Sequence, residues 1–308
     1  MAILSVFVCG VTGVQGGALV LELLAKGVSV HSLSRDLDSE KSKAVQSLGV
    51  KLWHGDFDNE EALKTAIAGT QALYLNLVPN FSDPSGELRQ AKLIIRVAKE
   101  SGVSHLVQGS GIGFDLLQQS VADQHDSPIA AMAQSKLDIE AEVRNAGFQT
   151  FTILRPGTFM TNFLAPFVAH YPGLAENGRW IAPVSPETAL PIVDPKTIGI
   201  FASAAILDPA RFNGKEIAYT DELLPIGELL NKLGKAAGKN LELVPLSDDE
   251  IETQKKQNPF IYVQLTMQEI HKQVDIEDVK TWKLPLSSFD AFLEGNKEKV
   301  QATFANVP

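Results

Sequence analysis

Cysteine, basic runs and long hydrophobic stretches are all scarce in this sequence. Cys9 is the only cysteine among 308 residues, which excludes an internal disulfide framework and a zinc site built from thiolates. No apolar stretch reaches the roughly 20 residues that span a bilayer. No cluster of His or carboxylates has the spacing of metal ligands, and no G-x-S-x-G hydrolase elbow occurs. We therefore expect no metal site and no membrane partner.

Positive charge is in deficit as well. The 27 Lys and Arg residues against 37 Asp and Glu give a net charge of −10. Such a chain, without a long basic run, repels a phosphate backbone, so we expect no direct binding of nucleic acid. The N-terminus lacks the basic flank and the cleavage site of a signal peptide, which favours a cytoplasmic protein.

The first half of the chain alternates short apolar runs with helical patterns. The apolar runs predict strands at residues 3–9, 29–34, 50–54, 72–78, 105–108 and 150–154. The patterns between them predict helices at residues 18–26, 59–68 and 87–101. Strands separated by helices form right-handed crossovers, so the expected fold class is α/β, with a Rossmann-like, doubly wound parallel sheet.

The second half has a different sequence pattern. Seven prolines between residues 156 and 195 exclude long helices in that segment. Further on, the pattern predicts a strand at 216–219 and helices at 194–207, 226–237, 248–258 and 269–274. We expect residues 1–155 to form a dinucleotide-binding domain, to which 190–212 return. Residues 156–189 and 213–308 are expected to form a smaller, α-rich lobe that binds a substrate or a partner.

A glycine-rich turn, from Gly10 to Gly17 in the form G-x-T-G-x-Q-G-G, follows the first predicted strand directly. Glycines let a chain turn tightly and bring backbone N–H groups close to a pyrophosphate, and the helix behind presents its positive end. This placement favours a dinucleotide site. A plain strand-to-helix turn is the alternative.

Arg35 and Asp36 end the second predicted strand, about twenty residues beyond the glycines. An arginine at this place receives the 2′-phosphate of NADP, whereas an acidic residue binds the ribose 2′-hydroxyl of NAD. Arg35 comes first, and Lys41 and Lys43 add positive charge, so the sequence favours NADP(H). The alternative is a surface Arg–Asp pair that caps the next helix.

Asp56 and Phe57 follow the third predicted strand, at the sheet edge where an adenine rests. Asp56 is suited to accept from the adenine amino group, with Phe57 packed on the ring. A simple cap of the following helix is the alternative, and for Asp58 the two interpretations are equally supported.

These segments together resemble the NmrA-like family of atypical short-chain dehydrogenases/reductases. The resemblance covers nearly the whole chain, and its most specific parts are the glycine motif and the segments around Lys136 and Gly157. It is carried by Gly10–Gly17, Ser34–Asp36, Gly55-Asp56, Leu75-Asn76, Gln134–Glu140, Leu154–Phe163 and Leu190–Gly199. It implies an NADP(H)-binding lobe and a variable C-terminal lobe.

The resemblance also implies a role for each matching residue. Besides Gly10, the residues that would line the pyrophosphate are Thr12, Gly13, Val14, Gln15 and Gly16. Arg35 would hold the 2′-phosphate, with Asp56 and Phe57 near adenine. The middle of the cofactor would contact Leu75, Asn76 and Leu77, and its nicotinamide end Lys136, Gly157, Thr158, Phe159 and Met160. Arg89 matches a position that is sometimes basic and faces the cofactor.

The catalytic group is less clear from the sequence. Ordinary short-chain dehydrogenases use a Tyr four residues before a Lys, together with a Ser on the fifth strand. Ser110 and Lys136 stand in suitable places, but Met132 occupies the position of the Tyr and cannot transfer a proton. Other donors that can reach a substrate from the second half or from a loop are Tyr171, Tyr262 and His125, the last of which is equally explained as a surface residue.

Three interpretations fit Lys136. It hydrogen-bonds the nicotinamide ribose, acts as a general acid as in the related isoflavone-reductase-like enzymes, or is a solvated helical residue. An apolar group, which either lines a hydrophobic substrate pocket or forms core, comprises Phe159, Phe163, Phe167 and Trp180.

Three functions fit these features. The favoured one is an NADPH-dependent reductase of a small, largely apolar organic substrate. The missing Tyr motivates the second, a non-catalytic NADP(H) redox sensor that regulates a partner protein such as a transcription factor. The third is a redox-neutral isomerase or dehydratase that keeps the cofactor as a scaffold.

Overall fold

The computed structural model describes residues 4–124 and 127–308, and it contains two compact units. The first unit comprises the residues up to 111 together with 131–155 and 198–217, and the second comprises 112–130, 156–197 and 218–308. His125, named above as a proton donor, lies outside the described residues.

A seven-stranded sheet forms the centre of the first unit, in the order β10-β6-β5-β4-β1-β2-β3. Its strands are β1 (Ser5–Val8), β2 (Ser29–Ser34), β3 (Lys51–His54), β4 (Ala72–Leu75), β5 (His105–Gly109), β6 (Thr150–Pro156) and β10 (Lys215–Tyr219). All neighbours from β3 to β6 pair in parallel. The chain therefore winds outward in both directions from β1 and β4, which confirms the predicted doubly wound α/β fold.

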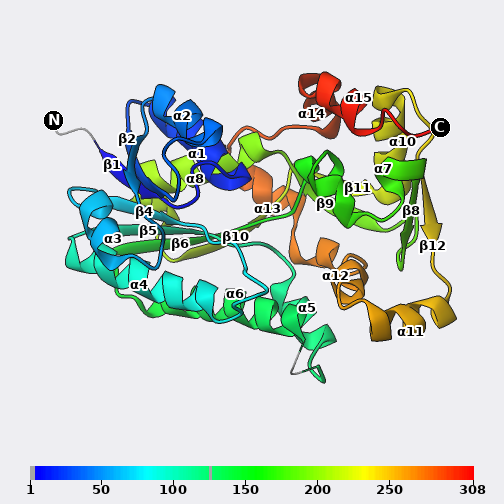
Figure 1. Cartoon of the computed structure of the whole chain (residues 1–308), viewed down its shortest axis with the longest axis horizontal. Helices are drawn as coiled ribbons and strands as arrows, with labels where there is room; N and C mark the ends of the chain where they lie inside the picture. Colours follow the sequence, from blue (N-terminus) through cyan, green and yellow to red (C-terminus); the bar gives the residue numbers. More distant parts are fainter. Residues whose placement is uncertain (1–3, 125–126) are drawn as a thin grey trace. The chain divides into compact units, whose positions relative to one another are not determined.

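Helices cover both faces of this sheet (Figure 1). Those of the first unit are α1 (Val14–Ala25), α2 (Glu40–Ser47), α3 (Glu60–Ile67), α4 (Gly86–Glu100), α6 (Pro128–Asn145), α8 (Pro195–Leu207) and α9 (Pro209–Phe212). On one face Leu63, Ile94 and Ile139 of α3, α4 and α6 share a core with the sheet residues Leu73 and Leu106. Burial of this apolar area holds the carboxyl ends of the strands at one edge.

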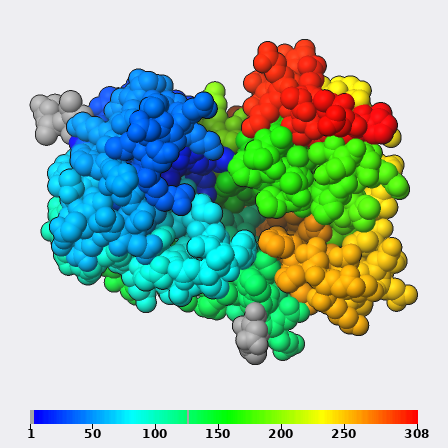
Figure 2. All heavy atoms as spheres, in the orientation of Figure 1, coloured from blue at the N-terminus to red at the C-terminus, as the bar shows by residue number. Residues whose placement is uncertain are grey.

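The second unit contains two small sheets and several helices. Its three-stranded sheet has β7 (Thr158–Phe159), β9 (Ala189–Val193) and β11 (Glu222–Pro225), and its two-stranded sheet has β8 (Arg179–Ala182) and β12 (Glu242–Pro245). Its helices are η1 (Met160–Phe163), η2 (Phe167–His170), η3 (Ile270–Gln273), α5 (Phe114–Ser120), α7 (Leu174–Asn177), α10 (Ile226–Ala237), α11 (Asp248–Gln257), α12 (Ile261–Thr266), α13 (Ile276–Thr281), α14 (Phe289–Gly295) and α15 (Lys297–Thr303). In Figure 2 the red C-terminal helices of this unit lie against its green residues, where Thr303 Oγ1 accepts from the Ala165 amide at 3.0 Å.

The division into units differs from the one expected from the sequence. Residues 112–130 belong to the second unit, so the two units are nearly equal in size. A long-range contact explains this: the Gly113 amide donates to Gln273 Oε1 at 2.7 Å, and α5 packs against α12. Such a contact leaves no local signal in the sequence.

Several element boundaries also differ. Helix α1 begins at Val14 rather than at residue 18, because Gly16 and Gly17 add no apolar side chain to the periodic pattern in its first turn. Strand β4 ends at Leu75, and residues 270–273 form only a 3-10 turn. Helix α6, which carries Lys136, was absent from the predicted elements because its apolar face is weakly defined.

Within the described residues, none of the helices has the length and apolar character needed to cross a bilayer.

Candidate cofactor-binding site

The glycine turn forms an open backbone cradle between β1 and α1. Gly10 has φ +70°, in the left-handed region that favours glycine, and its carbonyl accepts from the Gly13 amide at 2.9 Å. A Cβ on Gly16 would lie 2.3 Å from that carbonyl oxygen, so only glycine fits there. The result is a tight turn in which α1 begins directly behind the end of β1.

The start of α1 is suited to hold an anion. No side chain caps it, and its first turn carries no acidic residue. Among the described residues the amides of Val14, Gln15 and Gly16 have no acceptor. Unpaired N–H groups and the positive end of a helix dipole attract phosphate. The cradle therefore fits the pyrophosphate of a dinucleotide.

Gln15 and Asn76 lie at the sheet end of this cradle. The hydroxyl of Tyr74 donates to Gln15 Oε1 at 3.1 Å. Burial raises the pKa of Tyr74, so this phenol stays neutral in the sheet. Asn76 Nδ2 would lie 3.7 Å from a Cβ on Gly10, so the end of β4 adjoins the turn.

Cys9 precedes the turn and is fully buried in the core. Burial raises the pKa of Cys9 to about 12, so the side chain remains a neutral thiol rather than a nucleophile.

Arg35 is exposed at the end of β2, and in the described part of the chain its guanidinium has no ion-pair partner. The loop behind it is fixed: Ser42 Oγ donates to the Asp36 carbonyl at 2.7 Å and contacts Ser34 Oγ at 2.8 Å. Ser39, not Asp36, caps α2. The alternative of an Arg–Asp surface pair is therefore not found, and Arg35 remains available to an anion.

Asp56 is exposed after β3, and its Oδ1 accepts from the Asp58 amide at 3.0 Å. Asn59 caps α3 by accepting from the Ala62 amide at 3.0 Å, so the capping role proposed for Asp56 is already filled. Phe57 packs half-buried against the core of the first unit. This geometry leaves the predicted adenine contacts of both residues as predictions.

Arg89 does not have the free guanidinium that a cofactor contact would require. It donates to Asp58 Oδ1 at 3.1 Å and to Asp83 Oδ2 at 2.9 Å. These bonds link the loop after β3 to the loop after β4. For Asp58 they favour a structural role over a ligand contact.

Lys136 lies on α6 with only 11% of its side chain exposed, which contradicts the alternative of a solvated helical residue. Its Nζ donates to the Leu77 carbonyl at 2.9 Å and to Glu87 Oε1. Glu87, in the first turn of α4, is buried and accepts at Oε2 from Ser135 Oγ at 3.2 Å. Leu75 and Leu77 are themselves buried in the core, so Leu77 contributes its carbonyl rather than its side chain.

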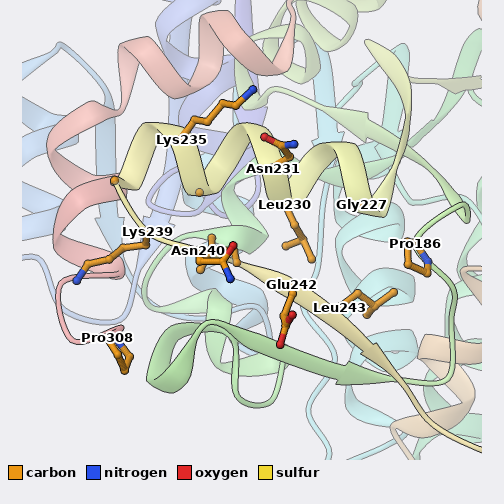
Figure 3. Close-up of a pocket in the computed structure, with 13 residues that line it drawn as sticks. Pro186, Gly227, Leu230, Asn231, Lys235, Lys239, Asn240, Glu242, Leu243 and Pro308 are labelled. Carbon is orange, nitrogen blue, oxygen red and sulfur yellow. The ribbon is translucent and has the colours of Figure 1, made fainter.

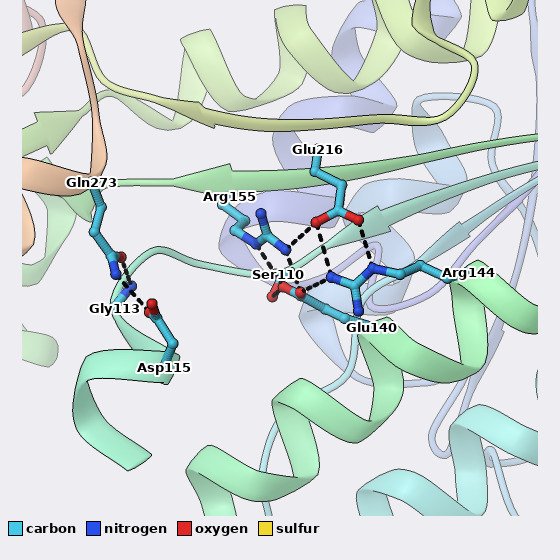
Figure 4. Close-up of polar contacts among 8 residues, drawn as sticks. All are labelled: Ser110, Gly113, Asp115, Glu140, Arg144, Arg155, Glu216 and Gln273. Atoms are coloured by element: carbon cyan, nitrogen blue, oxygen red, sulfur yellow. Dashed lines mark hydrogen bonds and ion pairs between the residues drawn. The ribbon is translucent and has the colours of Figure 1, made fainter. Parts of the chain in front are cut away.

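Ser110 belongs to a partly buried ionic network at the end of β5 and β6, in which Ser110 and Glu140 are the buried members (Figure 4). Its Oγ donates to Glu140 Oε1 at 2.8 Å, and Arg155 Nε donates to the same oxygen at 2.9 Å. Arg144 and Arg155 both donate to Glu216 on β10. Because the Ser110 proton is donated to a buried carboxylate, the geometry favours a structural role, and its predicted catalytic role stays untested.

The Glu216 carboxylate is expected to make stability depend on pH. The hydrogen bond from Arg144, followed by that from Arg155, lowers the pKa of Glu216 to about 2. A lowered folded-state pKa stabilises the fold above the unfolded-state value, and that contribution disappears as pH falls toward about 2. We expect Glu216→Gln to lower stability at pH 7 by about 1 kcal/mol, roughly 2 °C.

Thermal unfolding of both proteins at pH 7 and pH 3 checks this expectation. The difference between wild type and Glu216→Gln should shrink at pH 3. An equal difference at the two pH values would refute the assigned role of the carboxylate.

The remaining predicted cofactor residues belong to the second unit. Gly157 donates its amide to the Tyr219 carbonyl at 2.9 Å, Thr158 and Phe159 form β7, and Met160 is fully buried in the core of that unit. Their contact with a nicotinamide stays a prediction.

The aromatic group of the second unit is mostly core. Phe163 and Trp180 are fully buried and pack on Tyr171, with ring centroids 4.7 and 4.8 Å from it. Burial raises the pKa of Tyr171, so it is a poor proton donor. The Tyr262 hydroxyl accepts from Gln124. Phe167 is partly exposed, and it therefore differs from Phe163 and Trp180.

A groove of about 690 Å³ lies between α10 and β12 in the second unit (Figure 3). Its lining is mixed, with polar side chains such as Lys235, Asn240 and Glu242 beside apolar ones such as Leu230 and Leu243. None of the described residues predicted to hold a cofactor lines it. Residues 4–124 and 127–308 also contain no group of three His, Cys, Asp or Glu side chains placed to hold a metal ion.

A dinucleotide-type cradle at the edge of a doubly wound sheet places this protein in the class of Rossmann-like α/β proteins. The model of the NmrA-like family matches residues 4–291, so the chain belongs to the NmrA-like family.

Known relatives agree with this assignment. The chain is 28% identical over 258 residues to an NmrA-like family domain-containing oxidoreductase, malD, of Malbranchea aurantiaca, which covers 78% of this chain and 75% of that one. It is 25% identical over 244 residues to an NAD(P)H azoreductase of Xenophilus azovorans, with 79% and 77% covered. Among solved structures, the negative transcriptional regulator NmrA matches with a TM-score of 0.73 and 20% identity, over 99% of this chain and 96% of that chain, and supports the fold.

Proposed function

We propose that this protein is an NADPH-dependent reductase of a small, largely apolar organic substrate. The observation that carries the proposal is the open cradle before α1, whose amides have no acceptor among the described residues. The names of the relatives support it, since malD is called an oxidoreductase and the Xenophilus protein an NAD(P)H azoreductase.

NADP(H) is the proposed cofactor rather than NAD(H). The Arg35 guanidinium lies exposed at the end of β2, where a 2′-phosphate binds in this fold. Its supporting loop is held by Ser34, Ser39 and Ser42 hydroxyls, which reduces the entropy lost when the phosphate is bound. NmrA itself has been solved in complex with NADP and also in complex with NAD, so the proposed preference rests on Arg35.

The residues of this chain bind and orient rather than react. A bound nicotinamide nucleotide would supply the hydride. The amides at the start of α1 hold the pyrophosphate, Arg35 holds the 2′-phosphate, and Lys136 holds the nicotinamide ribose. The buried Glu87 carboxylate and the Leu77 carbonyl hold the Lys136 Nζ in place, so we assign Lys136 a binding role over that of a general acid.

Turnover of NADPH with a panel of quinones, azo compounds and carbonyls, followed by absorbance at 340 nm, tests the proposal. We expect wild type to oxidise NADPH with at least one member. Lys136→Met should lower kcat/KM by about tenfold, because one charge-assisted hydrogen bond is lost. Lys92→Met, which removes an exposed lysine of α4, serves as the control and should change little. Wild type without turnover on any class, or full activity of Lys136→Met, would contradict the proposal.

The second candidate is a redox sensor that binds NADP(H) without consuming it. Met132 in place of a Tyr, together with a Ser110 hydroxyl engaged by Glu140, favours this function because neither supplies a proton. Tight binding of NADPH combined with no turnover of the panel would select it. Its partner would then be a regulatory protein.

A further inference from the structure

Glu87 is a buried carboxylate to which the sequence assigned no role. It is 3% exposed, and it lies in the first turn of α4, where the helix dipole favours a negative charge. Lys136 Nζ and Ser135 Oγ donate to its two oxygens. An unpaired charge at this depth would be strongly destabilising, so Glu87 and Lys136 neutralise each other.

The Lys136 ammonium has three N–H donors in a tetrahedral arrangement. Glu87 and the Leu77 carbonyl accept two of them, and in the described part of the chain the third has no acceptor. Leu77 directly follows Asn76, beside the glycine turn. The free donor is therefore fixed at the carboxyl end of β4, close to the cradle.

The pair is not needed simply to join the two helices. Lys92 of α4 and Glu142 of α6 form a second ion pair, at 3.2 Å, between the same helices. Their side chains are 54% and 40% exposed, against 11% and 2% for Lys136 and Glu87. The Lys136–Glu87 pair differs from the Lys92–Glu142 pair in its burial. A buried ion pair costs desolvation free energy that a surface pair does not, but it holds its two charged groups in fixed positions.

We propose that Glu87 is a positioning residue, which together with the Leu77 carbonyl holds the Lys136 ammonium so that its third N–H meets the ribose of the nicotinamide nucleotide. This rests on the proposed binding of NADP(H). Glu87 itself touches no cofactor in this arrangement and acts only through Lys136.

Dissociation constants of the full-length protein, measured by fluorescence titration, test the proposal. The two probes are NADPH and adenosine 2′,5′-bisphosphate, which is the half of the cofactor that does not reach Lys136. Glu87→Gln should weaken the binding of NADPH by about tenfold, which is the equivalent of one charge-assisted hydrogen bond. The dissociation constant of the bisphosphate should change by less than about twofold. In the control Glu142→Gln, the dissociation constants of both probes should also change by less than about twofold.

A double-mutant cycle with Lys136→Met shows whether Glu87 acts through Lys136. In that background Glu87→Gln should have almost no further effect on NADPH. Wild-type affinity of Glu87→Gln, equal weakening of both probes, or an undiminished effect in the Lys136→Met background would each overturn the proposal.

Two further points keep the test decisive. If Glu87→Gln does not fold, Glu87→Asp retains the charge but withdraws it by one methylene, and NADPH affinity equal to wild type would overturn the proposal. Because every readout is an affinity, a wild type that binds NADPH but reduces nothing would refute only the proposed reductase activity.

Discussion

Replacing Gly16 by alanine is expected to weaken NADPH binding by at least about 100-fold, because two charge-assisted hydrogen bonds at the cradle are lost. The added Cβ would lie 2.3 Å from the Gly10 carbonyl oxygen, 2.6 Å from its carbon and 2.9 Å from the Cys9 oxygen. These are backbone atoms, which cannot rotate away. The start of α1 must then move from the end of β1, and its amides lose their common direction.

Overpacking of this kind also destabilises a fold by about 1–3 kcal/mol, so thermal unfolding is measured beside the titration. Gly295→Ala is the matched control, because no atom lies within 4 Å of the added methyl group. It should leave NADPH affinity unchanged. A folded Gly16→Ala protein that binds NADPH within threefold of wild type would refute the cradle as the pyrophosphate site.

Arg35→Ala is expected to weaken the binding of NADPH by about 10- to 100-fold and to leave the affinity for NADH within about twofold of the wild-type value. The physical reason is that the guanidinium has no ion-pair partner in the described part of the chain and is therefore available for the 2′-phosphate of the proposed cofactor. NADH lacks that phosphate. The ratio of the two dissociation constants is the quantity to measure.

Lys51→Ala provides the control for Arg35, because it removes the same charge from an exposed side chain at the start of β3, whereas Arg35 follows the end of the neighbouring parallel strand β2. On a chain of net charge −10, any lost cation weakens an anionic ligand slightly through the overall field. Equal losses of NADPH affinity for Arg35→Ala and Lys51→Ala, or an unchanged ratio of NADPH to NADH affinity, would show that Arg35 does not select the cofactor.

The parts of this site that the sequence predicted are those with local causes. The glycine turn could be predicted because the need for glycine at position 16 comes from backbone atoms of Cys9 and Gly10, only a few residues away. Strand β2 and helix α10 match their predicted bounds, since apolar periodicity and flanking breakers fix them locally. Family resemblance was also correct, and the matched region covers most of the chain.

The parts that the sequence missed depend on distant partners. Glu87 reads as an ordinary acidic residue in a first helical turn, and its lysine lies 49 residues further along the chain. Ser110 matches a catalytic position by spacing, yet its hydroxyl donates a hydrogen bond to Glu140, which lies 30 residues away in the sequence. Arg89 likewise reads as a free cation until Asp58 and Asp83 are brought to it. Only packing of α4 and α6 on the sheet creates these pairs.

Calorimetric titration of the wild-type chain with NADPH and with NADH tests the central claim most directly. The structure predicts one site per chain, with NADPH bound at least about tenfold more tightly than NADH, because the exposed Arg35 adds charge-assisted bonds. If neither dinucleotide binds, the proposal that the cradle before α1 is a dinucleotide site is wrong.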